Sequence, residues 1–142
     1  MSARYMGRLA CELSDLDPDR LNSWISLGYF ACAPETRPGK ARSFDENGVV
    51  SLKILSQLLT WGVSEKHACR LACEALDYIA NRPLTELLHY VQEPGAAAAI
   101  SHWTDTPQDK SAPGFASMLT FNVEVIRKDI REKFWGVSEE AR

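Results

Sequence analysis

The sequence of 142 residues lacks any long hydrophobic run, and it lacks a surplus of positive charge. Its longest uninterrupted apolar stretch is only a few residues, whereas a membrane-spanning helix needs about 20, and its first residues lack a signal-peptide core. We therefore expect a soluble, cytoplasmic protein with no membrane partner. The net charge of −3 gives no overall indication of nucleic-acid binding.

Residues that carry chemistry are also few. The three histidines, His67, His89 and His102, are dispersed, and no nucleophile, paired carboxylate or phosphate-binding glycine motif lies near any of them. We expect no enzyme, no catalytic residue and no cofactor.

The four cysteines contain no CxxC pair and no second cluster with metal-type spacing. In a cytosolic chain this pattern predicts four reduced, mostly packed thiols and no metal site. Cys69 and Cys73 are four residues apart on a predicted helix, with His67 nearby, which leaves a metal site or a thiol sensor as the less favoured alternative.

The composition itself is that of an ordinary globular protein, with 45% hydrophobic and 25% charged residues. Residues 1–82 carry ten basic and ten acidic side chains, and residues 83–142 carry six and nine, so the whole negative excess lies in the second part. The stretch from Thr36 to Phe44 has three positive charges and no negative one, at Arg37, Lys40 and Arg42. This stretch is where a polyanion would lie.

Two short helices are predicted at the start of the chain, over 6–13 and 18–27. Asp17 followed by Pro18 is a strong helix start, because Asp accepts free amide hydrogens and Pro lacks a donor that would go unpaired. Gly28 closes the second helix. Two such helices with a short turn form a helix-turn-helix, whose second helix presents Asp19, Arg20, Asn22, Ser23 and Ser26. Taken alone, this polar face is more typical of a solvated helix.

A basic hairpin is predicted next. Residues 29–33 and 41–44 form two paired strands in this interpretation, and the connecting loop 34–40 carries the cations. A basic loop that projects from a two-stranded ribbon beside a helix-turn-helix is a wing, which contacts the phosphates that flank the groove.

The rest of the chain is predicted to be α+β. An apolar helix over 47–60 forms the core, and Ser64 caps a helix that continues to Asn81. After Pro83 we expect strands at 87–91, 97–103 and 117–121, an exposed loop over 104–114, and a helix from the cap Asn122 to Phe134. The alanine run at the start of 97–103 is equally compatible with a helical turn. The predicted fold class is therefore α+β, mostly helical, with a DNA-binding domain at 1–82 and a C-terminal dimerisation or partner-binding region at 83–142. The aromatic residues proposed to join the two parts, or two copies of the chain, are Trp103, Phe115 and Trp135.

Several of these motifs occur in an order that resembles a known family. The stretch from about Tyr5 to Ile79 resembles the DNA-binding domain of MerR-type winged helix-turn-helix transcriptional regulators. The residues that carry the resemblance are Leu21-Asn22-Ser23-Trp24 with Gly28, Arg42-Ser43-Phe44, the leucine-rich helix, and Trp61-Gly62-Val63-Ser64.

The resemblance implies a second helix in the major groove and a wing on the backbone, on a two-fold DNA site. Residue by residue, it implies DNA contacts from Arg20, Asn22 and Ser23 on the helix and from Arg37, Lys40 and Arg42 on the wing. Asn22 stands where many members have an arginine, so Arg20 is the substitute for that phosphate contact. Pro83 interrupts the long dimerising helix of typical members, so dimerisation would need another element.

Three functions are compatible with this pattern. The preferred one is a compact sequence-specific transcription regulator of a phage or mobile element, a nucleoid-associated homodimer on double-stranded DNA with RNA polymerase as a candidate partner. The second is a DNA-packaging or architectural adaptor that tolerates many sequences. The third is a protein-interaction module that has lost DNA binding, which the negative net charge favours.

Overall fold

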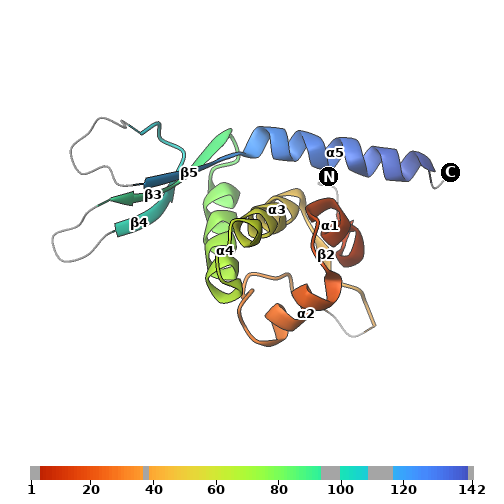
Figure 1. The fold of residues 1–142 in the computed structure, drawn as a ribbon. Helices are drawn as coiled ribbons and strands as arrows, with labels where there is room; N and C mark the ends of the chain where they lie inside the picture. Colours follow the sequence, from red (N-terminus) through yellow and green to blue (C-terminus); the bar gives the residue numbers. More distant parts are fainter. Residues whose placement is uncertain (1–3, 37–38, 94–99, 109–116, 141–142) are drawn as a thin grey trace.

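The computed structural model describes residues 4–36, 39–93, 100–108 and 117–140. Within these residues the chain forms five helices and two antiparallel sheets, one of two strands and one of three (Figure 1). The prediction of an α+β, mostly helical protein is therefore confirmed.

The first two helices follow the predicted capping signals closely. Helix α1 spans Gly7–Ser14 and ends at Asp15, whose backbone is left-handed at φ 58°. Helix α2 spans Pro18–Ser26. The side chain of Asp17 accepts a hydrogen bond from the amide of Asp19 at 3.0 Å, so it satisfies one of the free donors of the first turn. The turn between the helices is as short as predicted.

The predicted ribbon between residues 29–33 and 41–44 is wrong. Strand β2, Ser43–Phe44, pairs instead with strand β1, Tyr5–Met6, and residues 29–33 form turns without strand pairing. The amides of Tyr29 and Phe30 both donate to the carbonyl of Trp24, and the Phe30 side chain is only 1% exposed. The chain therefore folds back under the end of α2 because burial of Phe30 outweighs its strand propensity.

Helix α3, Glu46–Thr60, is the centre of the core. Asp45 caps it by accepting from the amide of Gly48 at 2.8 Å. Six of its apolar side chains are fully buried, namely Val49, Val50, Leu52, Ile54, Leu55 and Leu58. Helix α4, Glu65–Asn81, packs beside it. Ser64 holds the N-cap position of α4 as predicted, but its hydroxyl makes no capping hydrogen bond.

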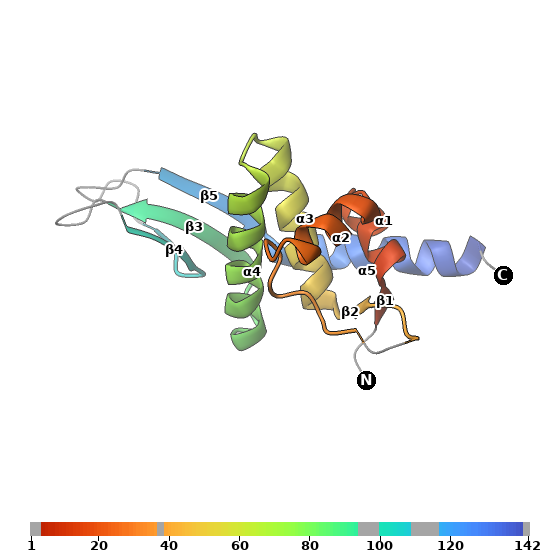
Figure 2. The same ribbon diagram turned by 90° about the horizontal axis from the view of Figure 1, so that it is seen from below.

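The three-stranded sheet has the order β4-β3-β5, with strands at Leu87–Glu93 (β3), Ile100–Thr104 (β4) and Ser117–Asn122 (β5). The sheet extends away from the helices on one side, as both ribbon views show (Figures 1 and 2). Trp103 attaches it to the helices, because its indole nitrogen donates to the carbonyl of Leu71 in α4 at 3.1 Å. The predicted strand residues 97–99 and most of the predicted loop 104–114 lie outside the described residues.

Helix α5 spans Val123–Glu140, six residues longer than predicted. Asn122 is its cap, since its side chain accepts from the amide of Val125 at 3.0 Å. Arg131 joins α5 to α3 through a two-pronged hydrogen bond to Glu46, with both distances 2.8 Å. On the outer side of α5, Asp129 pairs with Lys133 at 3.1 Å, and Lys128 pairs with Glu132.

Both parts of the chain contribute to one hydrophobic core. Leu88, Phe121 and Ile130 belong to the same buried cluster as the side chains of α1, α3 and α4. Trp103, 7% exposed, is part of this cluster, whereas Trp135 is 61% exposed and Phe115 lies outside the described residues. The division at residue 82 stays a prediction.

We expect Asp17→Ala to lower the free energy of unfolding by about 1 kcal/mol, because the amide of Asp19 loses its acceptor. Denaturant unfolding followed by circular dichroism measures the change. Ser26→Ala, at an exposed position near the other end of α2, is the control and should have almost no effect. Equal stabilities of the Asp17→Ala variant and the wild type would contradict the capping role.

Candidate nucleic-acid interface

Helix α2 and residues 27–36 and 39–42, which follow it, lie on the side of the molecule opposite α5 (Figure 1). The inner side of α2 is fixed by Leu21 and Trp24, which are 3% and 2% exposed. The predicted contact residues Arg20, Asn22 and Ser23 are all exposed. The helix therefore turns a polar face outward, at the place where the sequence predicted a binding surface.

Arg20 is not a free cation. Its guanidinium pairs with the carboxylate of Glu65 at the start of α4, and it lies 5.1 Å from the centre of the Trp24 ring. The indole nitrogen of Trp24 donates to the other carboxylate oxygen of Glu65 at 2.9 Å. The hydrogen bonds from Trp24 and Arg20 lower the pKa of Glu65. The carboxylate therefore stays ionised at neutral pH and offsets the charge of Arg20.

Asn22 and Ser23 are placed differently. Within the described part of the chain, neither side chain has a hydrogen-bond partner, so their polar atoms face solvent. An exposed amide and hydroxyl of this kind are able to donate to and accept from the edge of a base.

The three cations predicted for the wing have three different outcomes. Lys40 is exposed. Arg42 is half-buried, and its guanidinium donates to the carbonyl of Pro34 while its own carbonyl accepts from the amide of Gly7 at 2.9 Å. Arg37 lies outside the described residues. Arg42 therefore holds the segment in place. Of the two cations that the structure describes here, Lys40 is the one whose side chain is exposed to solvent.

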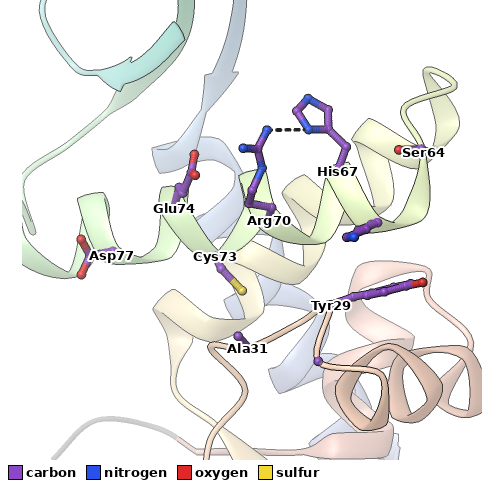
Figure 3. Close-up of a pocket in the computed structure, with 10 residues that line it drawn as sticks. Tyr29, Ala31, Ser64, His67, Arg70, Cys73, Glu74 and Asp77 are labelled. Atoms are coloured by element: carbon purple, nitrogen blue, oxygen red, sulfur yellow. Dashed lines mark hydrogen bonds between the residues drawn. The ribbon is translucent and has the colours of Figure 1, made fainter.

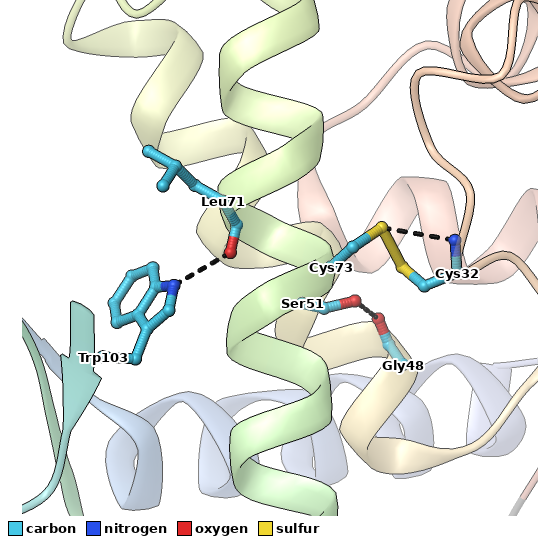
Figure 4. The surroundings of a disulfide bond; sticks show 6 residues. All are labelled: Cys32, Gly48, Ser51, Leu71, Cys73 and Trp103. Carbon is cyan, nitrogen blue, oxygen red and sulfur yellow. Dashed lines mark hydrogen bonds between the residues drawn. A yellow bond between two sulfur atoms is a disulfide. The ribbon is translucent and has the colours of Figure 1, made fainter. Parts of the chain in front are cut away.

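A disulfide joins the segment to α4. Cys32 and Cys73 are bonded across 41 residues of sequence, and the amide of Cys32 donates to the sulfur of Cys73 at 3.3 Å (Figure 4). The prediction of four reduced thiols is therefore wrong for this pair. Sequence reasoning missed it because no local pattern relates two cysteines whose contact depends on the fold of the whole N-terminal part. Cys11 and Cys69 are free and buried, as predicted.

A cavity of about 730 Å³ lies beside the disulfide, between residues 28–31 and the outer face of α4 (Figure 3). Lys66, His67 and Arg70 line one part of it, and Glu74 and Asp77 line another. A guanidinium nitrogen of Arg70 lies 2.7 Å from Nδ1 of His67. Lys66 and Arg70 were not predicted to line a site, because the helix pattern alone does not reveal that the loop after α2 faces this side of α4.

No protein-family model matches the chain, and no curated protein matches it in sequence. The relationship to MerR-type regulators therefore stays a prediction that rests on the residues quoted above. In the described ranges, no helix is both long enough and apolar enough to cross a membrane. The same ranges contain no group of three or more His, Cys, Asp or Glu side chains arranged to hold a metal ion.

We expect the Cys32–Cys73 bond to stabilise the oxidised protein by about 3 to 4 kcal/mol. The bond joins residues 41 positions apart, and the loop that it closes lowers the conformational entropy of the unfolded chain. The double variant Cys32→Ser, Cys73→Ser should lose this amount in denaturant unfolding under oxidising conditions. Under reducing conditions the wild type and the double variant should unfold at similar denaturant concentrations. A double variant as stable as the oxidised wild type would contradict this role.

Proposed function

We propose that the protein is a DNA-binding transcriptional regulator that inserts α2 into the major groove and acts as a homodimer on a two-fold DNA site. The observation that carries the proposal is the arrangement of α2. Its apolar side is fixed by Leu21 and Trp24, and Asn22 and Ser23 stand exposed without a partner in the described residues. A short, well-packed helix with free amide and hydroxyl groups at one end of the molecule has the form of a recognition helix.

The roles of the side chains follow from their chemistry. The amide of Asn22 can pair with adenine through two hydrogen bonds, which selects a base. Lys40 lies on the segment beside α2 and has no competing carboxylate among the described residues, so it suits a phosphate contact. Phosphate contacts fix position and supply affinity that falls with salt concentration.

Arg20 contributes less than its charge suggests. DNA has to compete with Glu65 for this guanidinium, and Trp24 orients Glu65 toward it. The proposed interface therefore has few free cations, and base contacts have to carry a large share of the discrimination.

A protein-interaction module is the second candidate, and the pairing of Arg20 with Glu65 favours it. This pair removes the positive charge from the helix that would meet DNA, which leaves a polar and nearly neutral face. Such a face is compatible with a protein partner.

The two candidates differ in binding to duplex DNA at low salt. We expect genome-wide mapping of bound sites to yield a two-fold sequence that the purified protein binds about 10³-fold or more tightly than a random duplex, with light scattering reporting a dimer. Absence of any affinity at low salt would refute the proposal and select the interaction module. Equal affinity for all sequences, together with a larger assembly, would refute it in favour of a packaging or architectural adaptor.

We expect Lys40→Ala to weaken binding to all duplexes alike and to reduce the salt slope of the affinity by about one. Asn22→Ala should instead change the preferred sequence while leaving the salt slope unchanged. Titrations at several salt concentrations with the mapped site and its base-substituted versions measure both effects. Lys133→Ala, an exposed cation on α5 at the opposite end, is the control and should alter neither. An unchanged slope in Lys40→Ala would show that Lys40 makes no phosphate contact.

We expect Glu65→Gln to tighten DNA binding by about threefold to tenfold, because it frees Arg20 for a phosphate. Glu124→Gln on α5 changes the net charge equally at a distant place, and it should have little effect. The gain from Glu65→Gln should vanish when Arg20→Ala is added. A gain that persists in the double variant would show that Arg20 does not reach DNA.

A further inference from the structure

We propose that a row of four side chains on α5 joins two copies of the chain as an antiparallel helix pair. The row consists of Val125, Lys128, Glu132 and Trp135, and we call it the α5 seam. Its effect on DNA binding rests on the proposed function, whereas the assembly itself does not.

The α5 seam lies on the side of the helix that faces away from the rest of the protein. Val123 and Ile130 are 0% and 1% exposed, so they turn the opposite side of α5 inward. Among the described residues, α5 packs mainly against α1, α3 and β3, and Figure 1 shows α1 and α3 on one side of it only. Val125 is 58% exposed and Trp135 is 61% exposed. Each end of the seam therefore presents a large apolar side chain to solvent.

The spacing of the seam is that of a coiled coil. Its members are three, four and three positions apart, which is the repeat that keeps side chains on one stripe when two helices wind around each other. Helix α5 has 18 residues. At about 1.5 Å per residue it is about 27 Å long, so the helix is long enough for each member of the seam to form one layer of a helix pair.

The two central charges select the direction of the pair. In an antiparallel pair Lys128 lies opposite the partner's Glu132, and the two-fold axis repeats this contact on the other side. A parallel pair in register would instead place Lys128 on Lys128 and Glu132 on Glu132, and like charges at such positions repel. Within one copy the charged atoms of Lys128 and Glu132 are 4.0 Å apart and largely exposed, so both are free to turn toward a partner.

The same register also pairs the apolar ends. When Lys128 faces the partner's Glu132, Val125 faces the partner's Trp135, because both pairs are symmetric about position 130. Exposed ion pairs add little affinity, whereas burial of a Trp side chain adds much. The ends therefore supply the affinity, and the charges supply direction and register. A shift by one heptad would place Glu132 against the partner's Trp135 and bury a carboxylate without a cation.

Self-complementarity is the reason that the partner is a second copy of this chain. Reversing the row exchanges its two charges and its two apolar ends, so every layer of the antiparallel pair is matched, and an unrelated partner needs no such symmetry. Trp135 is also one of the aromatic residues expected from the sequence to join two copies. The seam lies on the side of the molecule opposite α2 (Figure 1), so the assembly leaves Asn22 and Ser23 uncovered.

Charge exchange tests the helix pair without DNA. We expect sedimentation equilibrium of the full chain to report a concentration-dependent dimer. Lys128→Glu and Glu132→Lys should each raise the dissociation constant of the dimer by at least about tenfold, because both central layers then hold like charges. An equimolar mixture of the two variants should form a heterodimer, since every central layer again pairs opposite charges. The double variant Lys128→Glu, Glu132→Lys should dimerise like the wild type.

The matched control is Lys133→Glu. It also breaks an ion pair within α5, with Asp129 at 3.1 Å, but it lies outside the seam and should dimerise like the wild type. The mixture keeps the test independent of any loss of helix stability in the single variants. A wild type that stays monomeric, a single variant that dimerises like the wild type, or a mixture that stays monomeric would overturn the proposal.

Truncation tests the apolar ends. We expect Trp135→Ala to weaken the dimer by about 30-fold or more, because a buried Trp is a typical hot spot and the two-fold axis removes it twice. Leu84→Ala is the control, since Leu84 is 92% exposed and lies outside α5. A Trp135→Ala dimer as tight as the wild type would show that the seam is not the interface.

The last arm measures affinity for the mapped DNA site. Lys128→Glu and Glu132→Lys should each bind it about tenfold more weakly than the wild type, because two linked modules bind with a higher effective concentration than separate ones, and the mixture should recover the affinity. A dimer with the expected charge dependence and no affinity for DNA would refute the proposed function and support the seam. Specific DNA binding by a dimer that ignores the charge exchanges would overturn the seam and support the proposed function.

Discussion

The position of the Trp24 indole determines how α2 lies on the rest of the protein. The ring is buried, its nitrogen donates to Glu65, and its face supports Arg20, which pairs with the same carboxylate, so Trp24 and Arg20 together attach α2 to the start of α4. A buried indole nitrogen without an acceptor is unfavourable, and this favours keeping the Glu65 carboxylate in place. The same bond that orders α2 therefore also places a negative charge beside Arg20. Order and charge neutralisation at this surface are consequences of one contact.

Helix α4 connects all the parts that matter for the proposed interface. It receives α2 through Glu65, the following segment through Cys73, and the sheet through the carbonyl of Leu71. Its inner side is bound to α3 by fully buried alanine, cysteine and leucine side chains. Because small residues allow close packing, α4 lies close against α3 along this side. One helix therefore receives α2, the segment that follows α2, and the sheet.

The parts of the fold that sequence predicted well are those governed by neighbouring residues. Asp17 with Pro18 and Asn122 mark helix starts because a capping side chain and the amide that donates to it are within three residues of each other, and apolar spacing is sufficient to place the buried stripe of α3. The predicted ribbon failed because Phe30 is buried against α2 and because β2 pairs with β1, where Tyr5 lies opposite Phe44 and Met6 opposite Ser43. Strand pairing of this kind depends on the assembled core, which local propensity does not describe.

The candidate site was predictable in position but not in charge. The exposure of Asn22 and Ser23 follows from the helix period, whereas the pairing of Arg20 with Glu65 joins residues 45 positions apart. The same holds for the bond between Cys32 and Cys73. The pair of Arg20 and Glu65 reduces what charge contributes at this surface, since it offsets a cation. Under the proposed function, an interface with so few free cations gains little from counterion release, so its affinity would depend on how well its residues are held before they meet DNA. The burial of Leu21 and Trp24 and the Cys32–Cys73 bond therefore matter more under this proposal than they would on a strongly basic surface.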